Sequence, residues 1–227
     1  MTPDLERARF NMIEQQIRPW DVLDPRVLEL LSQVRREDFV PMQHRALAFV
    51  DMEIPLRGEH EDAIRSGQIM LNPKVEARLL QEAKPRAHEK VLEVGAGSGY
   101  MAALLGGMAQ RVITLDIEPE LVRMARDNLR KAGVQNVDVR EADGAQGLAA
   151  EGPFDVIVLS GSVAQVPSAL LQQLKVGGRL ATIVGEDPVM RATFVTRTGD
   201  TTFSTDQPWD TAAPRLVKFP EPSRFRF

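Results

Sequence analysis

The stretch Val91-Leu92-Glu93-Val94-Gly95-Ala96-Gly97-Ser98-Gly99-Tyr100 decides the fold of this 227-residue chain. It begins as a short apolar run of the kind that forms a buried strand. Three glycines at alternate positions follow, and they permit a tight turn in which a ligand can approach the backbone closely. Those glycines weaken the start of the next helix. Their presence therefore indicates that the turn does more than connect two elements. The stretch therefore predicts a strand, a glycine turn and a helix that together bind a ligand.

Strand-like and helical runs alternate along the chain after this point. Such alternation implies parallel pairing with right-handed crossovers, and hence a doubly wound sheet with helices on both faces. Two further strand-like runs near the C-terminus complete its edge. The predicted fold class is therefore α/β, with a mostly parallel seven-stranded sheet and an N-terminal helical extension. The predicted strands are 90–94, 111–116, 137–140, 155–160, 178–184, 192–197 and 201–205, and the clearest helices between them are 118–132 and 167–174.

The sequence divides into three zones. We expect residues 1–81 to form the helical extension and a loop on the substrate side, 82–190 to form the ligand-binding α/β core, and 191–227 to form the last strands and a tail. In the first zone, Asp24-Pro25 and Asn72-Pro73 are typical helix starts, an N-cap followed by proline at the first helical position. The charged segment from residue 53 to residue 71 is expected to be irregular, and a loop of that length is more often functional or mobile than merely connective.

The composition excludes several kinds of protein and site. The formal net charge is -4 and the isoelectric point about 5.5, with no basic run, so we expect no nucleic-acid partner. The chain contains no cysteine, which excludes disulfides and thiolate chemistry, and the spacing of His44, His60 and His88 fits no metal site. The sequence has no apolar leader and no run of about 18 uncharged apolar residues, so we expect a cytoplasmic protein that does not enter a membrane.

Three acidic residues, Glu93, Asp116 and Asp143, lie in or just after successive strands. Because ligands bind at the carboxyl ends of the strands of such a sheet, we expect these residues around one site. Asp116 lies where a carboxylate can accept both hydroxyls of a ribose, and Asp143 lies where it can reach an adenine amino group. A carboxylate at Glu93 would repel a pyrophosphate, whereas it suits a ligand that carries a sulfonium and an α-amino group. The acids therefore favour S-adenosylmethionine over a dinucleotide, and Tyr100 also stands where a dinucleotide motif has its third glycine.

Two sets of residues resemble known families. The first resembles S-adenosylmethionine-dependent methyltransferases in general, which implies their Rossmann-like fold. The second is narrower and resembles the N-terminal portion of protein-L-isoaspartate O-methyltransferases. The first set consists of 91–100, 116, 141–144, 153–158 and 174–180, and the second of 27–41, 54–56, 67–68, 72–73, 100 and 166–171.

The resemblance implies methyl transfer from S-adenosylmethionine to the free carboxylate of an isoaspartyl residue, a reaction of protein repair. A carboxylate is already a nucleophile near pH 7, so the enzyme's task is to align the reacting atoms and exclude water. The partner would then be a protein or peptide carboxylate. The cofactor-binding residues that we expect are Gln68, Glu93, Gly95, Ala96, Gly97, Ser98, Tyr100, Asp116, Ile117, Asp143, Gly144 and Ser160.

One segment departs from the family pattern. The family reads Gly-Gln-Thr-Ile-Ser-Gln-Pro, with a serine regarded as catalytic, whereas this chain has Gly67-Gln68-Ile69-Met70-Leu71-Asn72-Pro73. Leu71 therefore stands at the position of that serine, and the catalytic residue is left unassigned. The loop before it carries an insertion at 58–66. Ser160 and Ser162, after the fourth predicted strand of the α/β core, are possible replacement donors, and loop serines satisfied by the backbone are the alternative.

Other functions stay open at this point. The same fold could serve another small acceptor, or the chain could bind S-adenosylmethionine without catalysis. Methylation of a nucleic acid is disfavoured because no Asn-Pro-Pro-Tyr-like tetrad follows Ser160. Arg215 and Lys218 could pair with an acidic substrate, although surface charge is the default interpretation. The sequence specifies no oligomeric state.

Overall fold

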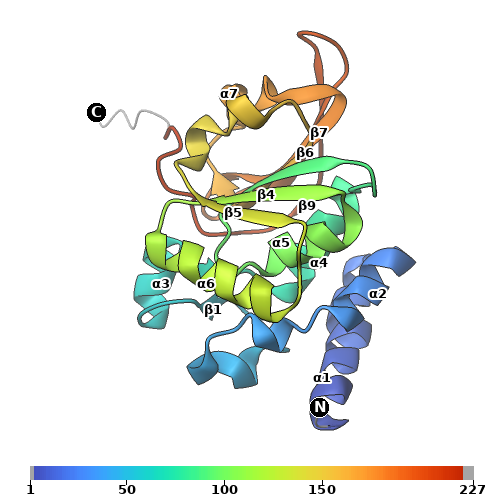
Figure 1. Cartoon of the computed structure of the whole chain (residues 1–227), viewed down its shortest axis with the longest axis vertical. Helices are drawn as coiled ribbons and strands as arrows, with labels where there is room; N and C mark the ends of the chain where they lie inside the picture. The colour runs from blue at the N-terminus through green and yellow to red at the C-terminus, as the bar shows by residue number, and fades with distance from the viewer. Residues whose placement is uncertain (1–2, 222–227) are drawn as a thin grey trace.

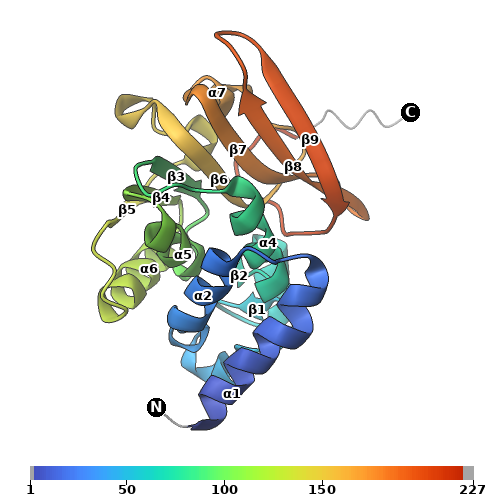
Figure 2. The same ribbon diagram turned by 90° about the vertical axis from the view of Figure 1, so that its right-hand side faces the viewer.

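A seven-stranded sheet forms the centre of the molecule in the computed structural model, which describes residues 3–221 (Figure 2). Its strand order is β5-β4-β3-β6-β7-β8-β9. Neighbouring strands from β5 to β7 pair in parallel, and β8 and β9 are added antiparallel through hairpins. The strands are β3 (Lys90–Val94), β4 (Arg111–Asp116), β5 (Val137–Glu141), β6 (Phe154–Val163), β7 (Leu174–Glu186), β8 (Val189–Arg197) and β9 (Phe203–Asp210).

The predicted doubly wound, mostly parallel sheet is confirmed, with β8 and β9 at its edge. Each predicted strand overlaps an observed one, although β6, β7 and β9 extend further than their apolar runs indicate. Hydrogen bonding to a neighbouring strand, rather than hydrophobicity, decides where a strand ends. We keep the three zones 1–81, 82–190 and 191–227 as a proposal about how the chain is organised.

Helices cover both faces of the sheet. The helices α4 (Pro73–Ala83), α5 (Tyr100–Met108) and α6 (Pro119–Lys131) lie on one face, and the short α7 (Ser168–Leu171) lies on the other (Figure 1). Side chains alternate along β3, so that Val91 joins the core beneath α4 and α5, whereas Leu92 and Val94 join the core on the α7 side. This alternation directs Glu93 towards α4 and α5.

The N-terminal helical extension packs outside α4 and α5 (Figure 2). The helix starting at Asp24-Pro25 is confirmed, because the Asp24 carboxylate accepts a hydrogen bond of 2.8 Å from the Arg26 backbone N–H. The second predicted start is also confirmed, since α4 begins at Pro73. The extension consists of α1 (Pro3–Met12), η1 (Ile13–Ile17), η2 (Arg18–Trp20), α2 (Pro25–Gln33), η3 (Arg36–Asp38) and η4 (Met42–Leu47).

Residues 53–71 are more ordered than the sequence indicates. They contain β1 (Ile54–Pro55), α3 (His60–Ser66) and β2 (Ile69–Met70), and β1 pairs with β2 in an antiparallel ladder. The helix α3 ends at Gly67, whose φ of +73° is the left-handed conformation that favours glycine. The expectation of an irregular loop was wrong because α3 spans only two turns, too few to produce a recognisable apolar period.

The C-terminal segment after β9 returns to the carboxyl edge of the parallel strands. The Ser162 backbone N–H donates to the Pro214 carbonyl at 2.8 Å, and the Leu216 N–H donates to the Ser162 carbonyl at 2.9 Å. These bonds hold residues 214–219 across the end of β6, and we call these residues the C-terminal strap. Within the described range 3–221, every helix is too short or too polar to cross a membrane.

Candidate functional site

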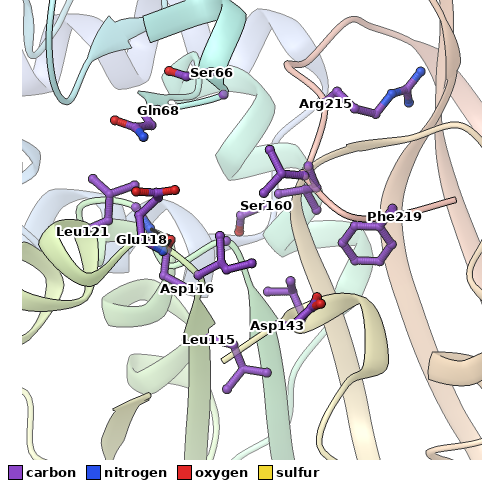
Figure 3. Close-up of a pocket in the computed structure, with 18 of the residues that line it drawn as sticks. Ser66, Gln68, Leu115, Asp116, Glu118, Leu121, Asp143, Ser160, Arg215 and Phe219 are labelled. Carbon is purple, nitrogen blue, oxygen red and sulfur yellow. Dashed lines mark hydrogen bonds between the residues drawn. The ribbon is translucent and has the colours of Figure 1, made fainter. Parts of the chain in front are cut away.

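Two cavities lie at the carboxyl edge of the sheet, around the glycine turn after β3. The larger has a volume of about 660 Å³ and opens between the end of α3 and the C-terminal strap (Figure 3). The smaller has a volume of about 270 Å³ and lies deeper, beneath α4 and α5. Ile69, Gly95, Gly97 and Ser160 line both cavities, so the two adjoin.

The glycine turn needs all three of its glycines. Gly95, Gly97 and Gly99 have φ values of +93°, +52° and +85°, which side chains rarely allow. A Cβ atom on Gly99 would also lie 3.2 Å from the Ala125 backbone, so this glycine lets α5 and α6 approach each other. Ala96 and Ser98 are buried within the turn. The turn leaves open backbone at the floor of the larger cavity, as the sequence predicted.

Asp116 lies at the end of β4 beside the glycine turn, as expected. Its Oδ2 accepts the Gly97 N–H at 2.9 Å, and its Oδ1 accepts the Glu118 N–H at 3.0 Å. Burial raises the pKa of Asp116 above its ordinary value, and these backbone hydrogen bonds oppose that rise. Asp116 also lines the larger cavity, where its carboxylate can accept further hydrogen bonds from a ligand.

Asp143 and Gly144 form the end of the larger cavity opposite α3 (Figure 3). The Asp143 Oδ1 accepts the Ala145 N–H at 3.0 Å, which leaves its second oxygen free for a donor such as an adenine amino group. A Cβ atom on Gly144 would lie 2.1 Å from the Val94 Cγ1 atom, so only glycine lets this loop pack on β3. Ile117 lines the same cavity, beside Asp116, Asp143 and Gly144. We call these four residues the nucleoside slot, after the ligand that the sequence predicts there.

Glu93 lies in the smaller cavity and does not line the larger one. Its side chain is fully buried, its Oε1 accepts the Ser160 hydroxyl at 2.6 Å, and its Oε2 has no partner among the described residues. Burial raises the pKa of Glu93 to about 8, and the charges of Glu76 and Asp116 add to the rise. Without a bound cation, Glu93 therefore holds a proton at pH 7, because burying an unpaired charge is costly. The sequence analysis expected an ionised carboxylate at this position.

Leu71 is buried in the wall of the smaller cavity, next to Glu93 and Tyr100. Tyr100 packs edge-to-face on Phe39, with ring centroids 5.5 Å apart, and its ring also faces this cavity. Neither Leu71 nor Tyr100 lines the larger cavity. The position at which the family has its serine is thus apolar and lies to one side of the nucleoside slot.

The two serines proposed as replacement donors occupy different places. Ser160 lines both cavities, with its hydroxyl bonded to Glu93. Ser162 is fully buried, lines neither cavity, and bonds the C-terminal strap through its backbone. Gln68 follows α3 and faces the larger cavity across from Glu118 (Figure 3). Of the two serines, only Ser160 is placed to contact a ligand.

The sequence did not reveal that the C-terminal strap lines the larger cavity. Leu216 and Phe219 contribute its side wall, and a Cβ atom on Gly95 would lie 3.0 Å from Leu216. Arg215 lies at the rim with its guanidinium turned away from Asp116, where it donates to the Gly185 carbonyl at 2.9 Å (Figure 3). The only feature of the sequence that pointed to this wall was a set of isolated apolar residues in a proline-rich tail. They show no periodic pattern from which a buried position could be predicted.

A glycine turn between a strand and a helix of a doubly wound sheet, with an acid at the end of the neighbouring strand, defines a nucleoside-binding α/β protein. The model of the family "Protein-L-isoaspartate(D-aspartate) O-methyltransferase (PCMT)" matches residues 7–212. The protein-L-isoaspartate O-methyltransferase of Koribacter versatilis is 40% identical over 193 residues, which cover 85% of this chain and 82% of the relative. The chain therefore belongs to the PCMT family of S-adenosylmethionine-dependent methyltransferases.

Other relatives agree with this assignment. The enzyme of the same name from Methanoculleus marisnigri is 38% identical over 79% of this chain and 78% of its own length. A solved protein-L-isoaspartate O-methyltransferase superimposes with a TM-score of 0.76 at 20% identity, over 93% of this chain and 65% of that one. A Plasmodium falciparum protein assigned to the same family, in complex with S-adenosyl-L-homocysteine, gives a TM-score of 0.75 at 19% identity, over 94% and 98% of the two chains. At these identities the solved structures show a shared fold.

The larger cavity fits the cofactor of this family. The carboxylates of Asp116 and Asp143 can accept hydrogen bonds from a nucleoside such as that of the cofactor, and the glycine turn leaves backbone exposed beside them. The structure and the family agree on S-adenosylmethionine as the cofactor of this enzyme.

Proposed function

We propose that this chain methylates the free carboxylate of isoaspartyl residues in proteins, with S-adenosylmethionine as methyl donor. The observation that carries the proposal is the pairing of Asp116 and Asp143 around one cavity beside the glycine turn, in a chain of the PCMT family. The relatives named for this activity match most of the chain. The family model covers residues 7–212, which include Asp116, Asp143 and the end of α3. Supporting geometry comes from the opening between α3 and the C-terminal strap, which gives a peptide a route to the site.

We assign the cofactor contacts residue by residue. Asp116 would hold the ribose, Asp143 with Ile117 and Gly144 would hold the adenine, and the backbone of residues 95–97 would hold the methionine part. Gln68 would close over the cofactor from the α3 side. When bound, S-adenosylmethionine supplies a methyl group activated by the sulfonium. Ser160 and Glu93 would then face the positively charged end, where Glu93 can hold or release a proton.

The acceptor would enter at the rim where α3 meets the C-terminal strap. A Cβ atom on Gly67 would lie 2.9 Å from the Arg215 carbonyl, so glycine lets these two segments meet. Ser66 and Gln68 are the polar side chains on the α3 side of this rim (Figure 3). Because the acceptor carboxylate is itself the nucleophile, the chain's residues need only orient it and exclude water. We infer that the enzyme manages without the serine hydroxyl that Leu71 replaces.

The experiment that tests the proposal uses one peptide in two forms, with isoaspartate or with ordinary aspartate at the same position. We expect purified protein to transfer labelled methyl only to the isoaspartyl form and to yield an ester that mild base hydrolyses. Calorimetric titration with S-adenosylhomocysteine verifies in parallel that the protein is folded and binds the cofactor product. Cofactor binding without turnover on several isoaspartyl peptides would overturn the proposal. The cytoplasmic location expected from the sequence stays a prediction, which cell fractionation would test.

A further inference from the structure

Arg36 is a fully buried cation that joins four segments of the chain. Its Nε donates to the Ala48 carbonyl at 3.0 Å, its Nη2 donates to the Leu71 carbonyl at 2.6 Å, and its Nη1 forms an ion pair with Glu76 on α4. The guanidinium carbon lies 5.0 Å from the centre of the Tyr100 ring, at the start of α5. Each nitrogen of the guanidinium thus contacts a different group. Only the planar, forked guanidinium of an arginine presents its donors in this way.

The segment that receives this hydrogen bond is held by different contacts at its two ends. It runs from Gln68 to Leu71 and lines both cavities. At its first residue, the Gln68 carbonyl accepts the Leu56 N–H and the Gln68 N–H donates to the Ala63 carbonyl, both at 2.9 Å, and the two-residue ladder with β1 continues from there. The Arg36 hydrogen bond to the Leu71 carbonyl anchors the far end of the segment, beyond the ladder.

We propose that Arg36 is a positioning residue for methyl transfer, because it clamps the cavity wall at Leu71 to the helix that follows the glycine turn. This inference rests on the proposed function for its kinetic readout. Arg36 contacts neither Asp116 nor Asp143, and its hydrogen bond is made at Leu71, three residues after Gln68. Its loss should therefore misalign the acceptor side more than it disturbs the nucleoside slot. Misplacement of a reacting group by about 1 Å can lower a rate by about 100-fold.

A simple substitution of Arg36 would leave Glu76 buried without a partner and unfold the protein. The test variant is therefore the double substitution Arg36→Met and Glu76→Gln, which removes both charges and keeps similar volumes. The matched control is Arg9→Met and Glu37→Gln, since Arg9 and Glu37 form a second buried ion pair within the N-terminal extension. Arg9 donates to the Ser32 carbonyl at 3.3 Å, and neither residue lines a cavity of the site.

Kinetics with an isoaspartyl peptide are expected to show kcat at least about tenfold lower in the Arg36 double variant, with a smaller change in KM. The dissociation constant for S-adenosylhomocysteine should stay within about threefold of wild type. The control should keep kcat within about twofold. Equal kcat in the two double variants, or a loss of cofactor affinity as large as the loss of kcat, would overturn the inference.

Two further measurements test whether Arg36 positions residues 68–72. Amide hydrogen exchange of residues 68–72 in the complex with S-adenosylhomocysteine should be faster in the Arg36 variant and unchanged in the control, whether or not an acceptor is known. Unchanged exchange there would refute the inference, whereas absent turnover by wild type would refute only the proposed function. The conservative variant Arg36→Lys keeps the positive charge opposite Glu76. It lacks the forked guanidinium that also reaches the Leu71 carbonyl. It should fold and still lose at least about fivefold in kcat, and full activity would refute the inference.

Discussion

The nucleoside half of the site, around Asp116 and Asp143, takes its residues from successive strand ends between residues 93 and 144. In the function proposed above, the acceptor half takes its residues from 66–71 and from the C-terminal strap at 214–219, parts of which line the two cavities. Backbone hydrogen bonds of the sheet and the glycine turn hold the first half. Two-residue strands, a buried arginine and the Ser162 contacts hold the second. The cofactor side is therefore held by the sheet and the turn beside it, whereas the acceptor side depends on contacts between distant segments.

The largest expected effect tests whether the nucleoside half carries the cofactor affinity. Asp116→Asn keeps the shape of the side chain and removes its charge. Hydrogen bonds to a charged group contribute about 1.5–3 kcal/mol, so we expect S-adenosylhomocysteine to bind about 10- to 150-fold more weakly by calorimetry. Glu141→Gln is the control, because Glu141 is exposed at the end of the next strand. Equal affinities of the two variants for S-adenosylhomocysteine would show that the nucleoside half does not carry the cofactor affinity.

The second prediction concerns the packing that fixes Asp143. Gly144→Ala would bring a methyl group to within 2.1 Å of Val94, so the loop must shift. Overpacking of this kind costs about 1–3 kcal/mol, and we expect that loss in urea unfolding together with weaker binding of S-adenosylhomocysteine. Adding Val94→Ala should recover part of both losses because it removes the clash. Strict additivity of the two single effects would show that the contact does not matter.

The third prediction tests the protonation of Glu93 in the protein without cofactor. Its pKa of about 8 lies above the ordinary value of 4.5, so between these values the folded state holds a proton that the unfolded state lacks. Stability should therefore fall as the pH rises from about 5 to about 8, by at most about 1.4 kcal/mol per pH unit from this group. Glu93→Gln should flatten that slope in urea unfolding at several pH values. Identical slopes in variant and wild type would contradict the assignment.

The smallest expected effect concerns a surface ion pair of the segment that leads into α3. Arg57, just before α3, forms an ion pair with Glu120 at the start of α6, and their side chains are 39% and 49% exposed. Solvent screening limits such a pair to less than about 1 kcal/mol, so Arg57→Gln should change the free energy of unfolding by less than that amount. Glu120→Gln should behave alike. A larger loss of unfolding free energy would mean that this exposed ion pair contributes more to holding the segment around α3 than its solvent screening allows.

The nucleoside half could be predicted because its signals are local. Three glycines at alternate positions and acids at strand ends are read within a few residues of the contacts they make. The expected places of Asp116, Asp143 and the turn agree with the structure. The protonation of Glu93 could not be predicted in this way, because it depends first on burial by the surrounding elements and then on the charges of Glu76 and Asp116.

The acceptor half shows the opposite behaviour. The sequence identified Leu71 at the family's serine position, but not that its side chain lines the smaller cavity or that its carbonyl accepts a hydrogen bond from Arg36, 35 positions earlier. The C-terminal strap was interpreted as a tail, since no periodic pattern connects Leu216 to Gly95. Contacts of that sequence separation leave no mark in a single sequence.

The sequence by itself determined the doubly wound sheet, the glycine turn and the acids of the nucleoside slot, because backbone conformation and strand order follow from short-range patterns. Only the tertiary structure decided how the C-terminal strap, α3 and the buried Arg36 complete the site. Burial sets the charge state of Glu93 and the place of Leu71, and burial is a property of the packed chain rather than of any segment.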